Sequence, residues 1–152
     1  MLNNEQTISK LQFLLGTLRD GEKGYRESAD EATHADYKQL FNEYAAQRSR
    51  LIGELEQAIS RLGGKPQDHT SVGAALHRAW INVRDAITGK DDYAVIAEAE
   101  RGEDAAVENY QDVLKEELPS EIRTLVERQY AEVKSAHDRV RDLKHSLQAA
   151  RS

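Results

Sequence analysis

The chain of 152 residues contains no cysteine, only two prolines and no long hydrophobic run. The lack of cysteine excludes disulfides, thiolate catalysis and cysteine-based zinc or iron–sulfur sites. No apolar stretch approaches the roughly 20 residues of a membrane-spanning helix, and the N-terminus shows no secretory signal pattern. Basic residues are also in deficit, with 21 Lys and Arg against 27 Asp and Glu. We therefore expect a cytoplasmic protein that binds neither nucleic acid nor a membrane.

What the chain does contain is a repeated amphipathic pattern. Hydrophobic residues recur at spacings of three and four, which is typical of helices with one buried face. The scarcity of proline allows these helices to be long. The pattern predicts four long helices and one short helix, at residues of about 4–32, 34–62, 71–88, 91–117 and 119–148.

The lengths of the connections predict how these helices are arranged. Short connections join the first long helix to the second and the third to the fourth, so each pair is expected to be antiparallel. The second and third long helices are separated by a long crossover that contains the short helix. One long crossover gives the ferritin-like arrangement. The sequence therefore predicts an all-α fold: a single ferritin-like four-helix bundle spanning residues 1–152, with up-down-down-up topology.

Each apolar stripe is interrupted near its middle by polar or charged residues. Charged groups in a bundle core are costly unless they are paired, hydrogen-bonded or bound to metal. Counting from the helix ends at 1.5 Å per residue places the interruptions within about 8 Å of one another along the bundle. They are Glu22, Gln47, Arg48, Glu103, Gln129 and Glu132, with Glu100 and His137 one or two turns away.

One interpretation of this layer is a metal site. A carboxylate di-metal bundle takes one Glu from each of two helices and a Glu-x-x-His motif from each of the other two. Glu22 and Glu103 fit the single-Glu positions and would be the primary ligands. Glu100, Glu132 or His137 would contribute. The Glu-x-x-His motif itself is missing, because His137 follows Glu132 by five residues.

The competing interpretation is an internal network of ion pairs and hydrogen bonds. Arg48 at this level would repel a metal cation and would instead pair with Glu22 or Glu103. Gln47, Gln129 and nearby tyrosines would complete the network. The protein would then be a non-catalytic structural or protein-interaction bundle. Whether the chain is an enzyme stays open, and so does its assembly into a homo-oligomer; nothing in the sequence specifies the shell of an iron-storage cage.

Five blocks distributed along the chain carry a family resemblance. They are residues 20–24 (DGEKG), 75–80 (ALHRAW), 89–92 (GKDD), 100–106 (ERGEDAA) and 126–134 (VERQYAEVK). Together they resemble a bacterial family of ferritin-like four-helix bundles of unknown function. The resemblance implies a ferritin-like fold in a bacterial cytoplasm and a stress-related role, without an established reaction. Wider ferritin relatives bind two irons and oxidise them or handle peroxide, so iron or manganese is the metal that the resemblance implies.

Overall fold

The computed structural model describes residues 1–67 and 91–151. It contains four long helices, as the hydrophobic pattern predicts. The short helix expected at about 71–88 lies outside the described residues. The third long helix ends at Leu114, before the expected 117, and the fourth continues to Arg151, beyond the expected 148. The four helices are α1 (Asn4–Glu31), α2 (Ala35–Arg61), α4 (Asp92–Leu114) and α5 (Ser120–Arg151).

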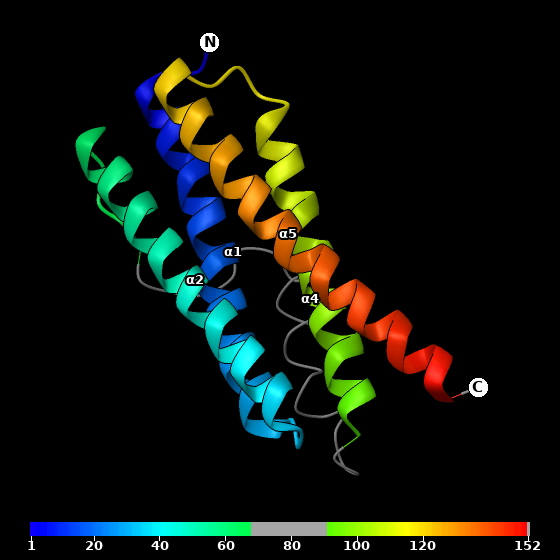
Figure 1. The fold of residues 1–152 in the computed structure, drawn as a ribbon. Helices are drawn as coiled ribbons and strands as arrows, with labels where there is room; N and C mark the ends of the chain where they lie inside the picture. The colour runs from blue at the N-terminus through cyan, green and yellow to red at the C-terminus, as the bar shows by residue number, and fades with distance from the viewer. Residues whose placement is uncertain (68–90, 152) are drawn as a thin grey trace.

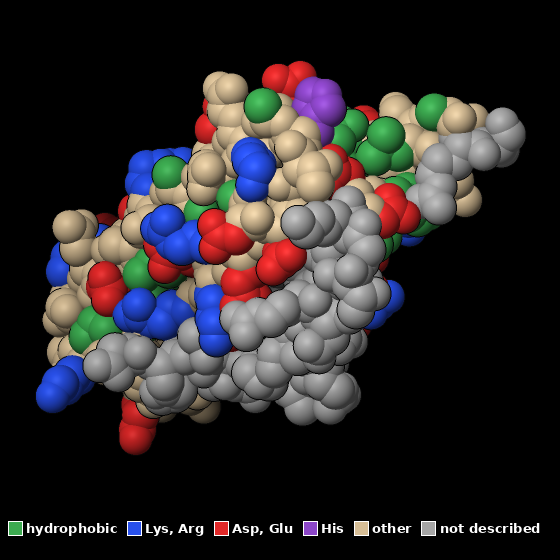
Figure 2. All heavy atoms as spheres, turned by 90° about the horizontal axis from the view of Figure 1, so that it is seen from below, with side chains coloured by type: hydrophobic (Ala, Val, Ile, Leu, Met, Phe, Trp, Pro, Cys, Tyr) green, Lys and Arg blue, Asp and Glu red, His purple; other side chains and the backbone are tan. Residues whose placement is uncertain are grey.

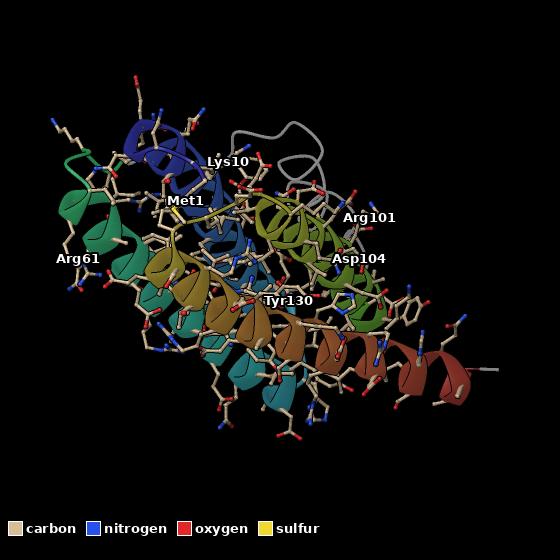
Figure 3. All side chains as sticks on the ribbon, turned by 90° about the horizontal axis from the view of Figure 1, so that it is seen from above. Met1, Lys10, Arg61, Arg101, Asp104 and Tyr130 are labelled. Atoms are coloured by element: carbon tan, nitrogen blue, oxygen red, sulfur yellow. The ribbon has the colours of Figure 1, made fainter. Side chains whose placement is uncertain are left out.

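Contacts at the two ends of the bundle fix its topology. At one end the backbone N–H of Leu2 donates to the carbonyl of Glu117, 2.8 Å away, so α1 begins where α4 has just ended. At the other end the backbone N–H of Thr33 donates to the Asp92 carboxylate, so α2 begins beside the start of α4. The up-down-down-up arrangement is thereby confirmed (Figure 1). A view from above places Met1 next to the α4–α5 connection (Figure 3).

Local side-chain chemistry sets where the helices begin. Asn3 caps α1 in a capping box, because its side chain accepts from the backbone of Gln6 while the Gln6 side chain accepts from the backbone of Asn3. His34 caps α2 by accepting from the backbone N–H of Asp36. Asp91 caps α4 by accepting from the N–H of Tyr93. Each cap satisfies a backbone donor that the first helical turn leaves free.

The hydrophobic core is divided into two clusters by a polar layer at mid-height. One cluster is built on the first half of α1 and the second half of α2, and the other on the opposite halves. Along α1 the change falls between Leu18 and Tyr25, and along α2 between Ala45 and Leu51. The buried charged residues Arg48 and Glu103 lie between the clusters, as the interrupted stripes predict.

The outside of the bundle is charged and mixed in sign. Viewed from below, Lys and Arg side chains alternate with Asp and Glu over much of the described surface (Figure 2). Over residues 1–67 and 91–151, no helix is both long and apolar enough to cross a membrane.

Candidate functional site

An ion pair between Arg48 and Glu103 occupies the middle of the core. Both side chains are 0% exposed. The two guanidinium nitrogens Nη1 and Nη2 lie 2.7 Å from the two Glu103 oxygens Oε1 and Oε2, respectively. This two-point contact joins α2 to α4. Nη2 donates a hydrogen bond to Oε2, whereas Nη1 and Oε1 are in ionic contact without a hydrogen bond between them. Both oxygens of Glu103 are thereby engaged by a cation that the protein itself supplies.

Neighbouring residues hold the guanidinium in place. Arg48 Nε donates to Gln47 Oε1 at 3.2 Å. The Cζ atom of Arg48 lies 5.3 Å from the centre of the Tyr25 ring, within the range of a cation–π contact. Phe41 packs on the same ring, with ring centres 5.9 Å apart. The charge is therefore enclosed by one carboxylate, one amide and one aromatic face.

Burial and the ion pair shift the protonation equilibria of this group. Burial alone would lower the pKa of Arg48, but the charge and hydrogen bond of Glu103, together with Tyr25 and Tyr110, outweigh it and raise that pKa above its usual range. Burial, reinforced by the charge of Glu103, raises the pKa of Tyr25 well above its ordinary value. Arg48 thus stays charged and Tyr25 stays neutral at physiological pH, which preserves the ion pair.

Gly21 on α1 makes room for the arginine. A Cβ atom built on Gly21 would lie 2.9 Å from Arg48 Nη1, closer than real Cβ contacts allow. The α1 stripe is interrupted at Glu22, and the glycine that precedes it admits a side chain from α2. Arg48 is fixed at its far end by Glu103, so it cannot move aside without weakening the ion pair.

We expect Gly21→Ala to lower the free energy of unfolding by about 1–3 kcal/mol, because overpacking displaces the guanidinium. Gly53→Ala on α2 is the matched control. Its Cβ would meet nothing within 4 Å, so it should stabilise the helix by up to about 1 kcal/mol. Urea unfolding of both variants measures the difference. Equal stabilisation by the two alanines would show that the guanidinium is free to shift.

A second polar group lies next to the ion pair along the bundle. Gln129 on α5 is 0% exposed and accepts from the Tyr110 hydroxyl at 2.8 Å. Its Nε2 donates to the carbonyl of Leu51 at 3.1 Å and to Glu54 Oε1 at 3.0 Å. Burial raises the pKa of Tyr110 above its ordinary range, so this hydroxyl remains a donor. The group therefore connects α2, α4 and α5 through neutral hydrogen bonds and one carboxylate.

Charged side chains extend this group along the α2–α5 seam. Glu132 on α5 pairs with Arg50 of α2, and it also lies 3.5 Å from Arg128 of its own helix. Arg128 in turn pairs with Glu54 of α2 at 3.0 Å. Gln47 donates to the backbone carbonyl of Glu132 at 3.3 Å. The carboxylate of Glu132 therefore faces two cations at the surface, and it does not reach the core pair.

The other expected ligands lie apart from Glu103. Glu22 sits on the flank of α1, 25% exposed, and accepts from Arg26 at 3.1 Å. Glu100 is 14% exposed and has one oxygen 3.6 Å from Lys144 Nζ. Its second oxygen, Oε2, is buried and has no hydrogen-bond partner among the described residues. Glu22 and Glu103 thus belong to separate contacts rather than to one site.

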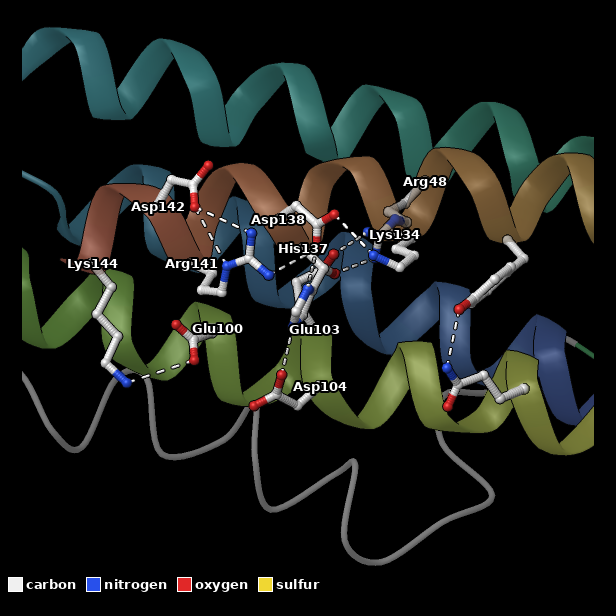
Figure 4. A network of polar contacts seen from close by, with 12 residues as sticks. Arg48, Glu100, Glu103, Asp104, Lys134, His137, Asp138, Arg141, Asp142 and Lys144 are labelled. Atoms are coloured by element: carbon white, nitrogen blue, oxygen red, sulfur yellow. Dashed lines mark hydrogen bonds and ion pairs between the residues drawn. The ribbon is translucent and has the colours of Figure 1, made fainter. Parts of the chain in front are cut away.

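His137 belongs to a network at the α4–α5 surface (Figure 4). Its two ring nitrogens contact Asp104 at 2.5 Å and Asp138 at 2.9 Å. Burial alone would lower the pKa of His137, but the hydrogen bonds to Asp138 and Asp104 outweigh it and raise that pKa. Lys134 and Arg141 surround Asp138, so this network is balanced in charge. His137 therefore bridges two helices rather than pointing at Glu103.

The donor set at mid-height does not fit a metal ion. The inward positions there carry a glycine, a guanidinium and one carboxylate that is already paired. The part of α5 at the same height in the bundle is residues 132–137. Its buried side chains are Val133 and Ala136, which offer no metal ligand. Across the described ranges 1–67 and 91–151, no three His, Asp or Glu side chains are grouped so that they could hold a metal. The arrangement supports an ion pair, not coordination.

The up-down-down-up arrangement of the four helices is the ferritin-like fold. More specifically, the chain belongs to the family described as a domain of unknown function (DUF2383), whose model matches residues 6–116. None of the curated proteins compared with the chain is significantly similar to it in sequence.

Solved structures agree with this fold. The dodecameric thioferritin, a bacterioferritin-related protein from Bacteroides fragilis, has a TM-score of 0.79 at 16% identity; the match covers 99% of this chain and 90% of that one. A Dps1 point mutant from Mycobacterium smegmatis has a TM-score of 0.76 at 14% identity, over 93% and 96%. The third similar structure is a two-domain protein from Anabaena variabilis with DJ-1/ThiJ/PfpI-like and ferritin-like domains. It has a TM-score of 0.78 at 16% identity; 98% of this chain is covered, which spans only 39% of that protein.

Proposed function

We propose that this protein is a non-catalytic ferritin-like bundle, a structural or protein-interaction module whose core uses an internal cation in place of a metal. The observation that carries the proposal is the two-point contact of Arg48 with both oxygens of Glu103. A guanidinium cannot coordinate a metal, and its charge opposes that of an incoming metal ion. The network interpretation of the polar layer is therefore preferred over the metal interpretation.

The proposal includes assembly and location. The similar protein from Bacteroides fragilis is a dodecamer. We propose that this chain also associates with copies of itself, which would suit a module that works through its surfaces. A cytoplasmic location and the lack of nucleic-acid binding stay predictions from composition, and a stress-related role rests on the family resemblance.

Metal binding by an altered site is the second candidate. Glu100 favours it, because its Oε2 is buried without a hydrogen bond in the described part of the chain and is a potential ligand atom. Glu100 lies one helical turn from Glu103 on α4. Iron or manganese bound there would leave the Arg48–Glu103 pair intact.

Anaerobic loading with Fe(II) or Mn(II), followed by desalting and elemental analysis, tests the proposal. We expect no stoichiometric metal in the wild type or in Glu100→Gln, which removes one carboxylate without touching the core pair. One or two metals per chain in the wild type, lost in Glu100→Gln, would establish the second candidate. Retention in both proteins would place the metal at another site and would equally contradict a metal-free role.

A further inference from the structure

An open groove separates the first half of α2 from the last third of α5. It forms a cavity of about 280 Å³. Its apolar lining is Tyr37 and Leu40 from α2 and Leu143 from α5. All three side chains are only half-buried, and Tyr37 and Leu143 pack against the core cluster that contains Tyr25 and Phe41. Figure 2 views the molecule from this end. It shows hydrophobic side chains among the charged ones near the place where the C-terminal end of α5 projects from the bundle.

The groove is open because the bridges between α2 and α5 stop at mid-height. Contacts from α2 to α5 are made by the middle and second half of α2, through Gln47, Arg50 and Glu54. In the described part of the chain, no hydrogen bond or ion pair joins residues 35–46 of α2 to residues 136–148 of α5. The lower part of the seam therefore exposes apolar surface that no element of the described chain covers.

The two walls of the groove carry opposite charges that do not meet. Asp36 and Glu43 line the α2 wall, and Arg139 lines the α5 wall. Within residues 1–67 and 91–151, neither Glu43 nor Arg139 forms an ion pair; Glu43 accepts only from the amide of Gln39, at 3.3 Å. An acidic wall opposite a basic wall makes the face self-complementary. A two-fold axis running along the groove would set the α2 wall of one copy against the α5 wall of the other.

We propose that the α2–α5 groove is the interface between two copies of this chain. Glu43 of one copy pairs with the partner subunit's Arg139, and the symmetry repeats this contact once. The half-buried Tyr37, Leu40 and Leu143 form the apolar centre, inside a charged rim, as in stable protein interfaces. This inference rests on the proposed function for its premise that the protein works through its surfaces, but its own test does not involve the core.

Charge reversal combined with mixing tests the interface. Sedimentation velocity of the wild type should show a dimer, or a larger assembly built from it. Arg139→Glu and Glu43→Arg should each raise the dissociation constant about tenfold or more, since each brings like charges together twice. An equimolar mixture of the two variants should associate as tightly as the wild type, because both interface pairs are then of opposite sign. Only contacts between chains produce this rescue.

The controls are Lys23→Glu on α1 and Glu108→Arg on α4, which make the same charge changes on exposed positions elsewhere. Both should assemble like the wild type. A monomeric wild type at every concentration would overturn the inference and would leave the groove for a different partner. Single variants that assemble normally, or a mixture that stays dissociated, would overturn it as well. Neither result alters the metal analysis that tests the proposed function.

Discussion

Glu103→Gln is expected to lower the free energy of unfolding by about 3–5 kcal/mol, because it leaves the Arg48 guanidinium charged and unpaired in the core. Glutamine keeps the size of the side chain, so the loss reports charge rather than a cavity. For a chain of this length the melting temperature should fall by roughly 6–20 °C. Urea unfolding at neutral pH, with thermal unfolding alongside, measures both quantities.

The matched control is Glu108→Gln, the same substitution at an exposed position of α4. It should change stability by less than about 0.5 kcal/mol. A similarly small effect of Glu103→Gln would mean that Arg48 finds another partner or water, which would contradict an enclosed ion pair.

Arg48→Met provides an independent check of the charge argument. It leaves a buried carboxylic acid, which can take up a proton, whereas the arginine left by Glu103→Gln cannot lose one in the accessible range. The folded Arg48→Met variant therefore binds a proton more tightly than the unfolded chain does, and its stability deficit should shrink as the pH falls. The Glu103→Gln deficit should not be relieved in this way.

Most of the fold is predictable from the sequence because long amphipathic helices leave a regular pattern. Spacings of three and four mark the buried stripes, and the contrast between short and long connections gives the topology. The helix ends are less predictable. α4 ends at Leu114 although the residues up to 117 are compatible with a helix, and the backbone N–H groups of Lys115 and Glu116 bond three residues back. Such tight last turns leave little trace in hydrophobic periodicity.

The candidate site was only half predictable. The pairing of Arg48 with Glu103 follows from two charges at the same level of a core. The position of Glu22 does not follow from the sequence. The apolar stripe of α1 predicts that Glu22 points inward, but in the structure Gly21 lies at the inward position. Glycine carries no hydrophobic signal, so periodicity cannot recognise it as a core residue. Its role follows only from the packing of Arg48, whose Nη1 would lie 2.9 Å from a Cβ atom at this position.

Small residues explain the position of Glu100 in the same way. The buried face of α4 includes Ala99, Gly102 and Ala106. These residues turn the helix so that Glu103 points inward while Glu100 stays at the edge, near Lys144. The role of Glu54 as a partner of buried Gln129 was not anticipated. The i,i+4 spacing of Arg50 and Glu54 indicates no more than a pair on one helix, because the third partner comes from α5.

Replacing both members of the ion pair by apolar residues should undo most of the damage done by removing one. We expect Arg48→Met/Glu103→Leu to be within about 1 kcal/mol of the wild type or more stable by up to about 4 kcal/mol, since no buried charge remains to be compensated. The large difference between this variant and the sum of its single substitutions is the coupling energy of the pair. Urea unfolding of the full cycle measures it.

The hydroxyl of Tyr25 should lower the stability of this double variant below that expectation. It is buried beside the Glu103 carboxylate, whose charge helps to raise its pKa, so the double variant removes a polar neighbour of this hydroxyl at a cost of up to about 1–3 kcal/mol. Adding Tyr25→Phe removes the hydroxyl, and the triple variant should then equal or exceed the wild type in stability. A double variant as unstable as Glu103→Gln, unrescued by Tyr25→Phe, would show that the geometry of the pair itself is required.

Stability alone does not exhaust what the ion pair does, because it also links α2 directly to α4 between the two apolar clusters. Methyl groups pack in many relative positions, whereas a directional hydrogen bond within a buried ion pair restricts them. A triple variant that matches the wild type in free energy of unfolding but shows broadened NMR signals would assign the pair to specifying one alignment of α2 against α4. Sharp signals at full stability would instead mean that the clusters align the helices without it, and the ion pair would then be dispensable for both folding and register.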